Sequence, residues 1–316
     1  MISSSGGTPR RAIDGVLLLD KPRGITSQAA VTQAKRLIGA AKAGHTGTLD
    51  PMATGLLPLA FGEATKFSHA LLEADKSYAA IVRLGVTTTT GDLEGEVVRR
   101  APVAVNREEI DSTLARFRGE IQQIPPMYSA LKHAGKPLYA YARAGTDVPR
   151  APRRIHIASL ELEHYAEGEL RIKVTCSKGT YIRVLAADIG AALGCGACLA
   201  ALTRTEVGRF GLDAAIALDA LSGLSEPERL ARLLPVDALV ADLPRLELDQ
   251  EQATRLLRGQ PVARSHAVAP GLVRIYGPDA AFLGLAEAAQ PDRLVARRLM
   301  AAKAAMLEKT RAYRVK

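Results

Sequence analysis

The sequence predicts an α+β protein with a mixed or antiparallel central sheet flanked by helices, followed by a small β-rich C-terminal module. Apolar residues alternate over 155–165 and again over 169–176, on either side of a Glu-Gly turn, which is typical of a β-hairpin. Residues 107–118 instead carry apolar side chains at helical spacing. After Pro244, short alternating segments separated by proline-containing turns predict the β-rich module.

The chain of 316 residues is long enough for a large and a small domain, each with its own core. We expect a flexible N-terminus over 1–12, the large domain over 13–244, and the small module with a basic tail over 245–316. The polar N-terminus lacks the apolar stretch of a secretory signal, and no apolar run is long enough to predict a transmembrane helix. These features favour a cytoplasmic protein.

The three cysteines, Cys176, Cys195 and Cys198, argue against a disulfide framework because their number is odd. Cys195 and Cys198 form a CxxC pair, but no second pair or nearby histidine accompanies them. We therefore expect ordinary buried thiols, with a zinc site as the alternative.

The first half of the chain predicts alternating strands and helices. Residues 14–20 form a buried strand that ends at a Lys-Pro turn. Thr26 or Ser27 can cap the following helix, whose apolar positions recur up to Ile38. The other elements expected here are a short helix over 64–73, strands over 76–84 and 96–99, and a helix over 107–118 that begins with a capping box of Asn106 and Glu109.

The stretch from Gly44 to Gly62, GHTGTLDPMATGLLPLAFG, is the part of the chain best suited to chemistry. Its glycines and prolines predict a shaped loop rather than a continuous regular element. Its one acidic residue, Asp50, precedes a proline that biases it away from helical geometry. The apolar run that follows predicts an anchor in the core. The alternative is a turn aspartate that accepts a local hydrogen bond.

Two segments are strongly basic. Residues 132–154 hold six Lys or Arg against one acid, and residues 291–316 hold eight against two. This pattern predicts a polyanion that contacts the protein in two places, although a solvated basic face remains the alternative. The segment over about 120–154 also interleaves tyrosines with basic side chains, which suits RNA binding. A plain surface connection with a short helix near 138–144 is the alternative.

A second motif follows the predicted hairpin, where CSKGTY leads into a helix over 182–193. Thr180 can cap this helix, which leaves Tyr181 and Arg183 in its first turn. Arginine is unfavourable there for the helix dipole, so we expect Arg183 to face an external anion or a carboxylate. An arginine on the surface without a fixed partner is the alternative.

These segments together resemble the bacterial tRNA pseudouridine synthase B family, whose members isomerise uridine 55 in the T-loop of tRNA. The resemblance covers nearly the whole chain and rests on motifs that fall in the family's order: GVLLLDKPRGITS, AGHTGTLDPMATGLLPLAFGEATKF, DKSYAAIVRLG, IPPMYSALK and CSKGTYIRVLAADIG. It implies the pseudouridine synthase fold, with a catalytic domain over 13–244, an RNA-binding insertion over about 120–154 and a PUA-like RNA-binding domain over 245–316. It also implies a monomeric isomerase that acts on tRNA without an obligate protein partner or a membrane.

The resemblance assigns catalytic roles to three residues. Asp50 matches the catalytic aspartate, proposed to attack the target nucleotide or to assist glycosidic cleavage. Tyr78 matches a tyrosine that stacks on the flipped base and is implicated in proton transfer. Arg183 matches an arginine that pairs with the catalytic carboxylate, and such a partner would keep Asp50 ionised and aimed.

Three further residues match substrate-binding positions. His45 matches a histidine thought to enter the RNA loop, Tyr181 is the neighbour of the arginine in its motif, and Leu202 matches an apolar residue of the uracil pocket. The segment CLAALTRTEVGRF departs from the family pattern, because Cys198 and Thr203 stand where the family often has a histidine and an arginine. This departure weakens the assignment of Leu202 and leaves Asp50 untouched.

The implied reaction needs no cofactor. Isomerisation detaches uracil from its ribose, rotates it and reattaches it through carbon, without redox change or phosphate activation. Walker, dinucleotide-binding and metal-ligand motifs are absent from the sequence. Other functions stay open at this point: an RNA-binding or tRNA-folding module, a relative that modifies other RNA within a guide complex, and a hydrolase with an aspartate nucleophile.

Overall fold

The computed structural model describes residues 11–263, 269–290 and 293–301. The first ten residues and the tail after residue 301 lie outside the described residues, and so do the predictions made for them. No helix in the described ranges is long and apolar enough to cross a membrane. All three cysteines are buried and free, which confirms the expectation of ordinary thiols.

A ten-stranded mixed sheet forms the centre of the large domain. Most neighbouring strands are antiparallel, whereas the β1–β14 and β3–β12 pairs are parallel. The order across the sheet is β14 (Ile216–Ala217), β1 (Gly15–Lys21), β3 (Thr54–Phe61), β12 (Ala197–Val207), β4 (Lys76–Leu84), β11 (Glu169–Cys176), β10 (Arg153–Ala166) and β7 (Gly119–Gln123), with β2 (Ala43–His45) beside β3 and β13 (Phe210–Gly211) beside β12. The α+β prediction is confirmed.

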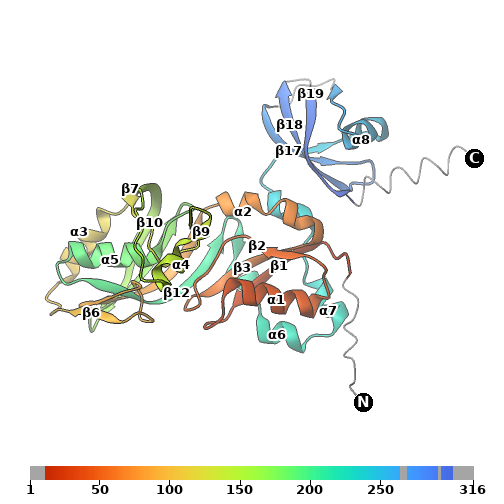
Figure 1. Cartoon of the computed structure of the whole chain (residues 1–316). Helices are drawn as coiled ribbons and strands as arrows, with labels where there is room; N and C mark the ends of the chain where they lie inside the picture. The colour runs from red at the N-terminus through yellow and green to blue at the C-terminus, as the bar shows by residue number, and fades with distance from the viewer. Residues whose placement is uncertain (1–10, 264–268, 291–292, 302–316) are drawn as a thin grey trace, which may run out of the picture.

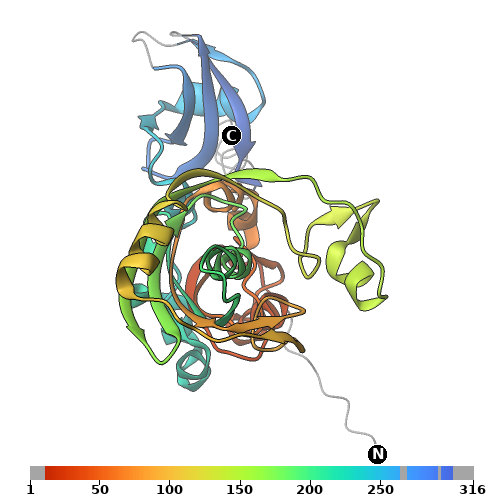
Figure 2. The ribbon, with the colours of Figure 1, turned by 90° about the vertical axis from the view of Figure 1, so that its left-hand side faces the viewer.

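Helices cover the sheet in two groups (Figure 1). α1 (Ser27–Ile38), α6 (Leu218–Gly223) and α7 (Glu226–Ala231) lie together beside β1, with Thr26 as the N-cap of α1. α5 (Ile182–Ala192) lies within the curve of the sheet, as Figure 2 shows. The shorter elements are η1 (Gly62–Lys66), α2 (His69–Glu73), β5 (Val86–Thr88), β6 (Val97–Arg100), α3 (Arg107–Ala115), η2 (Leu212–Ala214) and η3 (Val236–Val240). The predicted capping box of Asn106 and Glu109 is present at α3.

The prediction that residues 44–62 form one shaped loop is wrong for most of the stretch. Only residues 46–53 are irregular, between β2 and β3. Pro58 is tolerated inside β3 because β12 pairs with residues 54–55 and β2 with residues 59–61, so no neighbour on that side needs an amide donor at 58. The carbonyl of Pro58 accepts from the Thr46 amide at 3.1 Å. The apolar run is fully buried, as predicted.

The prediction that Thr180 caps the helix is also wrong. Its Oγ1 donates to the Ser177 carbonyl at 2.9 Å, which closes the turn before the helix. Tyr181 occupies the N-cap position without a side-chain bond to the helix. A side-chain amide provides the cap instead, because Gln123 Oε1 accepts from the Tyr181 amide at 2.8 Å.

The insertion is shorter than the predicted range of about 120–154. Residues 120–123 belong to β7 and residues 153–154 to β10, and these two strands pair directly in the sheet. The excursion between them contains the small hairpin β8 (Lys132–His133) and β9 (Lys136–Pro137), followed by α4 (Leu138–Arg143). It projects from the body of the large domain (Figure 2).

A separate five-stranded sheet forms the C-terminal module, in the order β15 (Arg245–Glu247), β17 (Gly271–Tyr276), β18 (Phe282–Gln290), β19 (Arg293–Leu299) and β16 (Val262–Ala263), with α8 (Gln250–Leu257) against it. Aromatic residues attach the module to the large domain. Phe282 packs edge-on against Phe67 with 5.3 Å between ring centroids, and the Tyr276 hydroxyl donates to Asp237 at 2.6 Å. The two parts therefore share a buried apolar cluster.

Gly190 allows the close approach of α5 to β12. A methyl group at this position would lie 2.2 Å from the Ala197 amide nitrogen. Gly190→Ala should therefore destabilise the protein by about 1–3 kcal/mol through overpacking, although alanine is the better helix former. Thermal unfolding followed by circular dichroism would measure this.

The matched control is Gly223→Ala, at the end of α6, where an added methyl group meets nothing within 4 Å. We expect the melting temperature of this variant to equal or exceed that of the wild type. Equal stability of the two variants would contradict the packing that the structure describes at Gly190.

Candidate active site

Asp50 lies between two cavities. The inner cavity, of about 350 Å³, lies beneath the loop over 46–53, and the outer cavity, of about 570 Å³, lies on its other side towards α1. Both are lined by Asp50 and Arg183. The inner cavity also brings together three of the other predicted site residues: Tyr78, Tyr181 and Leu202. His45 lines the outer cavity.

Arg183 holds Asp50 in place. Its Nε donates to Asp50 Oδ2 at 2.8 Å, its Nη1 to the Thr90 carbonyl at 2.9 Å and its Nη2 to the Tyr128 carbonyl at 2.7 Å. The Arg183 side chain is 5% exposed, whereas that of Asp50 is 37% exposed. The predicted carboxylate partner of Arg183 is therefore present, and the carboxylate faces the cavities while the guanidinium remains buried.

Sequence reasoning missed a second carboxylate at this point. Asp92 Oδ2 lies 3.6 Å from Arg183 Nε, and the Asp92 side chain is 7% exposed. Asp92 Oδ1 is held by the Thr90 hydroxyl at 2.6 Å and the Glu94 amide at 3.1 Å. The only sequence signal was a turn rich in threonine and glycine. A buried aspartate so fixed helps Asp50 to balance the charge of Arg183.

Tyr78 lies on β4 directly opposite Arg204 on β12. Burial raises the pKa of the Tyr78 hydroxyl, and the charge of the facing Arg204 guanidinium opposes that rise. Tyr78 is therefore a neutral phenol at neutral pH. Its ring is partly exposed to the inner cavity, so it can present an aromatic face to a flat ligand.

Tyr181 is positioned by Gln123, which was also missed from the sequence. The Gln123 side chain accepts from the Tyr181 amide and donates to its carbonyl, at 2.8 and 3.1 Å. Burial raises the pKa of the Tyr181 hydroxyl. Because Gln123 ends β7 and Tyr181 is the N-cap residue of α5, this amide pair fixes the edge of the inner cavity to the sheet.

Leu202 is 7% exposed and lines the inner cavity from β12. The neighbouring Thr203 takes part in the structure, although it departs from the family pattern. Its hydroxyl lies 2.9 Å from that of Thr54, where β12 joins β3. Cys198, the other departure, is fully buried.

His45 ends β2 and belongs to the outer cavity. Its Nδ1 accepts from the Gly47 amide at 3.4 Å. Burial, assisted by the charge of Arg204, lowers the pKa of His45 below its usual 6.5. The ring is therefore neutral at physiological pH, and any contact with RNA would be by shape or stacking rather than by charge.

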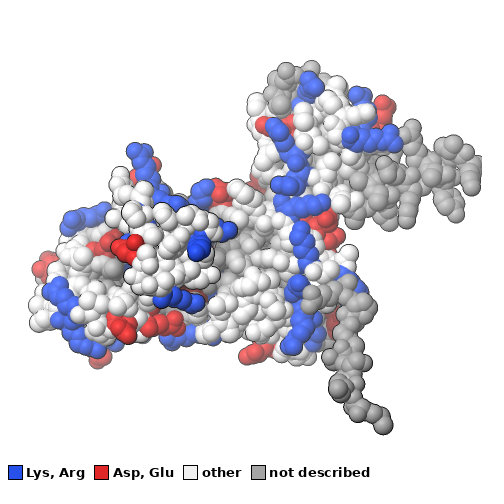
Figure 3. All heavy atoms as spheres, viewed as in Figure 1, with Lys and Arg blue, Asp and Glu red and all other residues white. Residues whose placement is uncertain are grey.

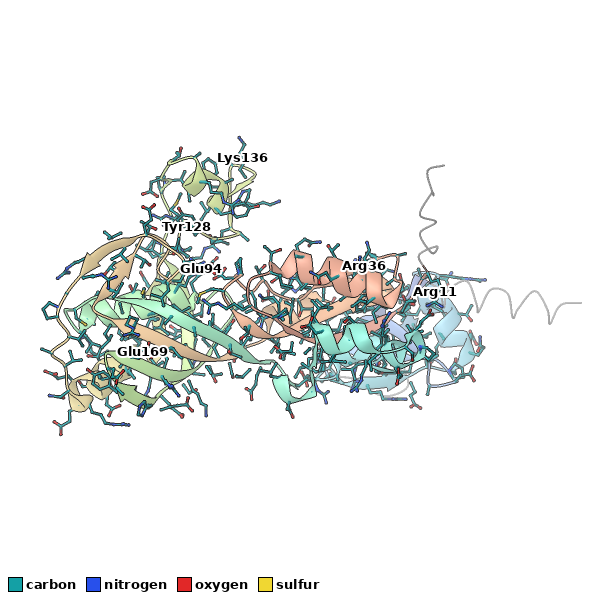
Figure 4. All side chains as sticks on the ribbon, turned by 90° about the horizontal axis from the view of Figure 1, so that it is seen from below. Arg11, Arg36, Glu94, Tyr128, Lys136 and Glu169 are labelled. Atoms are coloured by element: carbon teal, nitrogen blue, oxygen red, sulfur yellow. The ribbon has the colours of Figure 1, made fainter. Side chains whose placement is uncertain are left out.

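The base of the insertion forms one wall of the outer cavity. Figure 4 shows Tyr128 there, close to Glu94, with Lys136 at the far end of the insertion. Elsewhere on the surface, Lys and Arg side chains form a band from the C-terminal module over the adjoining end of the large domain (Figure 3). No group of three potential metal ligands occurs in the part of the chain that the structure describes.

Comparison with known proteins agrees with this geometry. Residues 35–182 match the TruB family pseudouridylate synthase N-terminal domain. Residues 183–241 match the tRNA pseudouridylate synthase B C-terminal domain, and residues 244–300 match the pseudouridine synthase II TruB C-terminal region.

Curated relatives match along almost their full length. Proteins named tRNA pseudouridine synthase B from Aromatoleum aromaticum and Methylobacillus flagellatus are 58% and 53% identical to this chain, over 92% of it and 94% and 96% of their own lengths. The corresponding protein of Burkholderia mallei is 56% identical over 90% of this chain and 98% of its own.

A solved Cbf5-Nop10-Gar1 complex contains a chain that is 27% identical and superposes with a TM-score of 0.68, covering 90% of this chain and 84% of that one. A chain of an H/ACA RNP bound to a substrate RNA has the same fold, with a TM-score of 0.68 at 24% identity, over 95% of this chain and 94% of that one. The family matches, the relatives and the shared fold together show that the chain belongs to the TruB family of pseudouridylate synthases.

Proposed function

We propose that this chain converts uridine 55 in the T-loop of tRNA to pseudouridine. Its relatives are named for tRNA and its family for pseudouridine formation, which supports an isomerase with a tRNA substrate. The observation that carries the proposal is the Asp50 carboxylate, which Arg183 holds at 2.8 Å between two cavities. One carboxylate oxygen is engaged, so the other can face a nucleotide.

The reaction conserves all atoms of the nucleoside. The bond from N1 of uracil to C1′ of ribose breaks, the base rotates, and a bond forms between C5 and C1′. C5 then loses its proton and N1 gains one, so uridine and pseudouridine are isomers. Asp50 serves this chemistry either by attacking the nucleotide or by stabilising positive charge on the detached sugar, and both roles require an ionised carboxylate.

The inner cavity suits an extruded uracil. A base inside a folded RNA loop must leave its stack before its glycosidic bond can be reached. Tyr78 supplies an aromatic face, and Leu202 supplies an apolar wall. Tyr181 closes the same cavity. His45 is neutral and lines the outer cavity, and we assign it to the gap that the flipped base leaves in the RNA.

Two basic surfaces are assigned to tRNA. We assign the insertion to the T-stem-loop, because the segment where the insertion leaves the large domain contacts Arg183 through the Tyr128 carbonyl. We assign the PUA-like module over 245–316 to a second region of the same tRNA. The enzyme acts as a cytoplasmic monomer and requires no cofactor, since the isomerisation needs neither a redox group nor a metal.

Asp50→Asn should abolish pseudouridine formation and leave RNA binding within about threefold of wild type, because the amide cannot supply the charge that the reaction needs. Tritium release from a T-stem-loop labelled at C5 of the target uridine measures turnover, and filter binding measures affinity. Asp188→Asn, on the partly buried side of α5, is the matched control and should keep wild-type turnover. Turnover by Asp50→Asn would refute the assigned role.

Arg183→Lys should slow single-turnover conversion by at least about 10²-fold, because misplacement of a reacting group by roughly 1 Å has that effect. Lysine cannot reproduce the three divergent bonds to Asp50, Thr90 and Tyr128. Rapid-quench kinetics with excess enzyme would test this. A wild-type rate constant would mean that the ion pair is dispensable.

Lys132→Gln combined with Lys136→Gln, both exposed on the insertion, should weaken RNA binding and lower the slope of log Kd against log salt by up to about 2, if each lysine neutralises one phosphate. Lys173→Gln is the control, because that ammonium already pairs with Glu163 at 2.6 Å. An unchanged slope in the double variant would assign the RNA contact elsewhere.

A further inference from the structure

Arg204 is an unusual residue for the centre of a sheet. It lies on β12 and is 1% exposed, and it is one of the largest fully buried side chains in the described residues. Burial lowers the pKa of its guanidinium, yet arginine remains charged in proteins. In the described residues, the active-site carboxylates Asp50 and Asp92 form their ion pairs with Arg183 instead. A buried cation without an acid costs free energy unless other groups solvate it.

Backbone carbonyls of the loop over 46–53 and of the adjoining strand β3 solvate this charge. Arg204 Nε donates to the Leu56 carbonyl at 2.8 Å, Nη2 to the Gly47 carbonyl at 3.2 Å and Nη1 to the Thr48 carbonyl at 3.5 Å. These acceptors lie on both sides of Asp50 in the sequence. The guanidinium therefore clamps the two ends of the loop that carries the carboxylate.

The backbone of Arg204 also packs closely against the strand that follows the loop. Gly55 pairs with Arg204 across the β3–β12 joint, with a φ of +99°. A Cβ at Gly55 would lie 2.4 Å from the Arg204 carbonyl oxygen, so only glycine allows this approach. A Cβ at Gly47 would lie 3.6 Å from Arg204 Nη1. The loop and the start of β3 therefore contact both the guanidinium and the backbone of Arg204.

The fourth neighbour of the guanidinium is the Tyr78 hydroxyl. Tyr78 faces Arg204 directly across the β4–β12 pair. Three charged or titratable neighbours bear on this hydroxyl from different elements: Arg204 on β12, Cys176 on β11 and Asp50 in the loop. Of these, Arg204 alone favours the ionised phenol. A guanidinium that faces a phenol can donate to its oxygen, which leaves the hydroxyl proton to point away from the guanidinium.

We propose that Arg204 is a positioning residue for pseudouridine formation, which fixes the loop that carries Asp50 and orients the hydroxyl of Tyr78 through the same guanidinium. The proposal rests on the proposed function, since its main readout is the isomerisation. Arg204 lines the inner cavity, but its three guanidinium nitrogens donate to backbone carbonyls, so in our proposal it does not act on the reacting atoms itself. It sets the relative positions of the two groups that do.

Arg204→Lys tests the proposal, because lysine keeps the charge and loses the fork that serves several acceptors. Arg229→Lys is the matched control. Arg229 also donates to three backbone carbonyls, those of Leu37, Leu221 and Ser222, but it lies among α1, α6 and α7, away from both cavities.

The measurement is a single-turnover tritium-release assay with excess enzyme. Positioning predicts that the Arg204→Lys rate constant falls by roughly 10²-fold at full amplitude, while Kd for the stem-loop stays within about threefold. Arg229→Lys should keep the wild-type rate constant. A merely structural role predicts the opposite pattern for Arg204→Lys: an unchanged rate constant while folded enzyme exceeds the RNA, with the defect seen instead as unfolded protein in circular dichroism. That result would overturn the proposal.

A second readout needs no RNA. In protein labelled with ¹³C at the tyrosine ring carbon that bears the hydroxyl, Tyr78→Phe identifies the Tyr78 signal. That signal should shift in Arg204→Lys and stay in place in Arg229→Lys. An unmoved signal would overturn the link to Tyr78. Arg204→Gln, which keeps a side-chain donor without charge, replaces the lysine variant if that one fails to fold.

The two proposals fail separately. If the wild-type enzyme releases no tritium from the stem-loop, the proposed function is wrong, whereas the ¹³C shift still reports on the contact between Arg204 and Tyr78. If the wild type is active and Arg204→Lys equals it in rate constant, only the role of Arg204 is wrong.

Discussion

The ion pair of Arg183 is the contact on which the rest of the site depends. One buried guanidinium joins the loop that carries Asp50, the turn that carries Thr90 and Asp92, the base of the insertion at Tyr128, and α5, where it originates. Truncating one partner of such a group leaves the others facing an unpaired charge, which costs several kcal/mol. The four segments are therefore expected to order together.

Two arginines hold the region around Asp50, and the groups that surround them differ. Arg183 faces carboxylates and so belongs to a balanced cluster. Arg204 faces carbonyl dipoles and a phenol, and it forms no ion pair with an acid in the part of the chain that the structure describes. One arginine fixes the end of a side chain, and the other fixes the backbone that carries that side chain. A catalytic side chain is held in one orientation only when both its end and the backbone that carries it are fixed.

Most strands and helices could be predicted from periodicity, because burial on one face imposes it. The failures have local causes. Pro58 and the glycines made a buried strand resemble a loop. Proline is allowed at position 58 because neither β12 nor β2 pairs with it there, and that pairing is decided by segments distant in sequence. Thr180 had the right type for a cap, but its hydroxyl closes the preceding turn while Gln123, far away in sequence, caps the helix.

The site was predictable only where residues carry a motif. Asp50, Tyr78, Arg183, Tyr181 and Leu202 meet at one cavity, although their roles in catalysis stay predictions. Arg204 had no signal in the sequence, and Asp92 had only a turn rich in threonine and glycine, because a buried partner is defined by contacts between segments. The role assigned to the last part of the chain also stays a prediction.

The aromatic attachment of the C-terminal module has a consequence for recognition. Phe282 and Tyr276 belong to the same buried cluster as Phe67, so the distance from the module to the inner cavity is built into the protein. An RNA that touches both places must match that distance. If the module contacts RNA as proposed, this arrangement selects RNA by its folded dimensions and leaves most of its sequence unread.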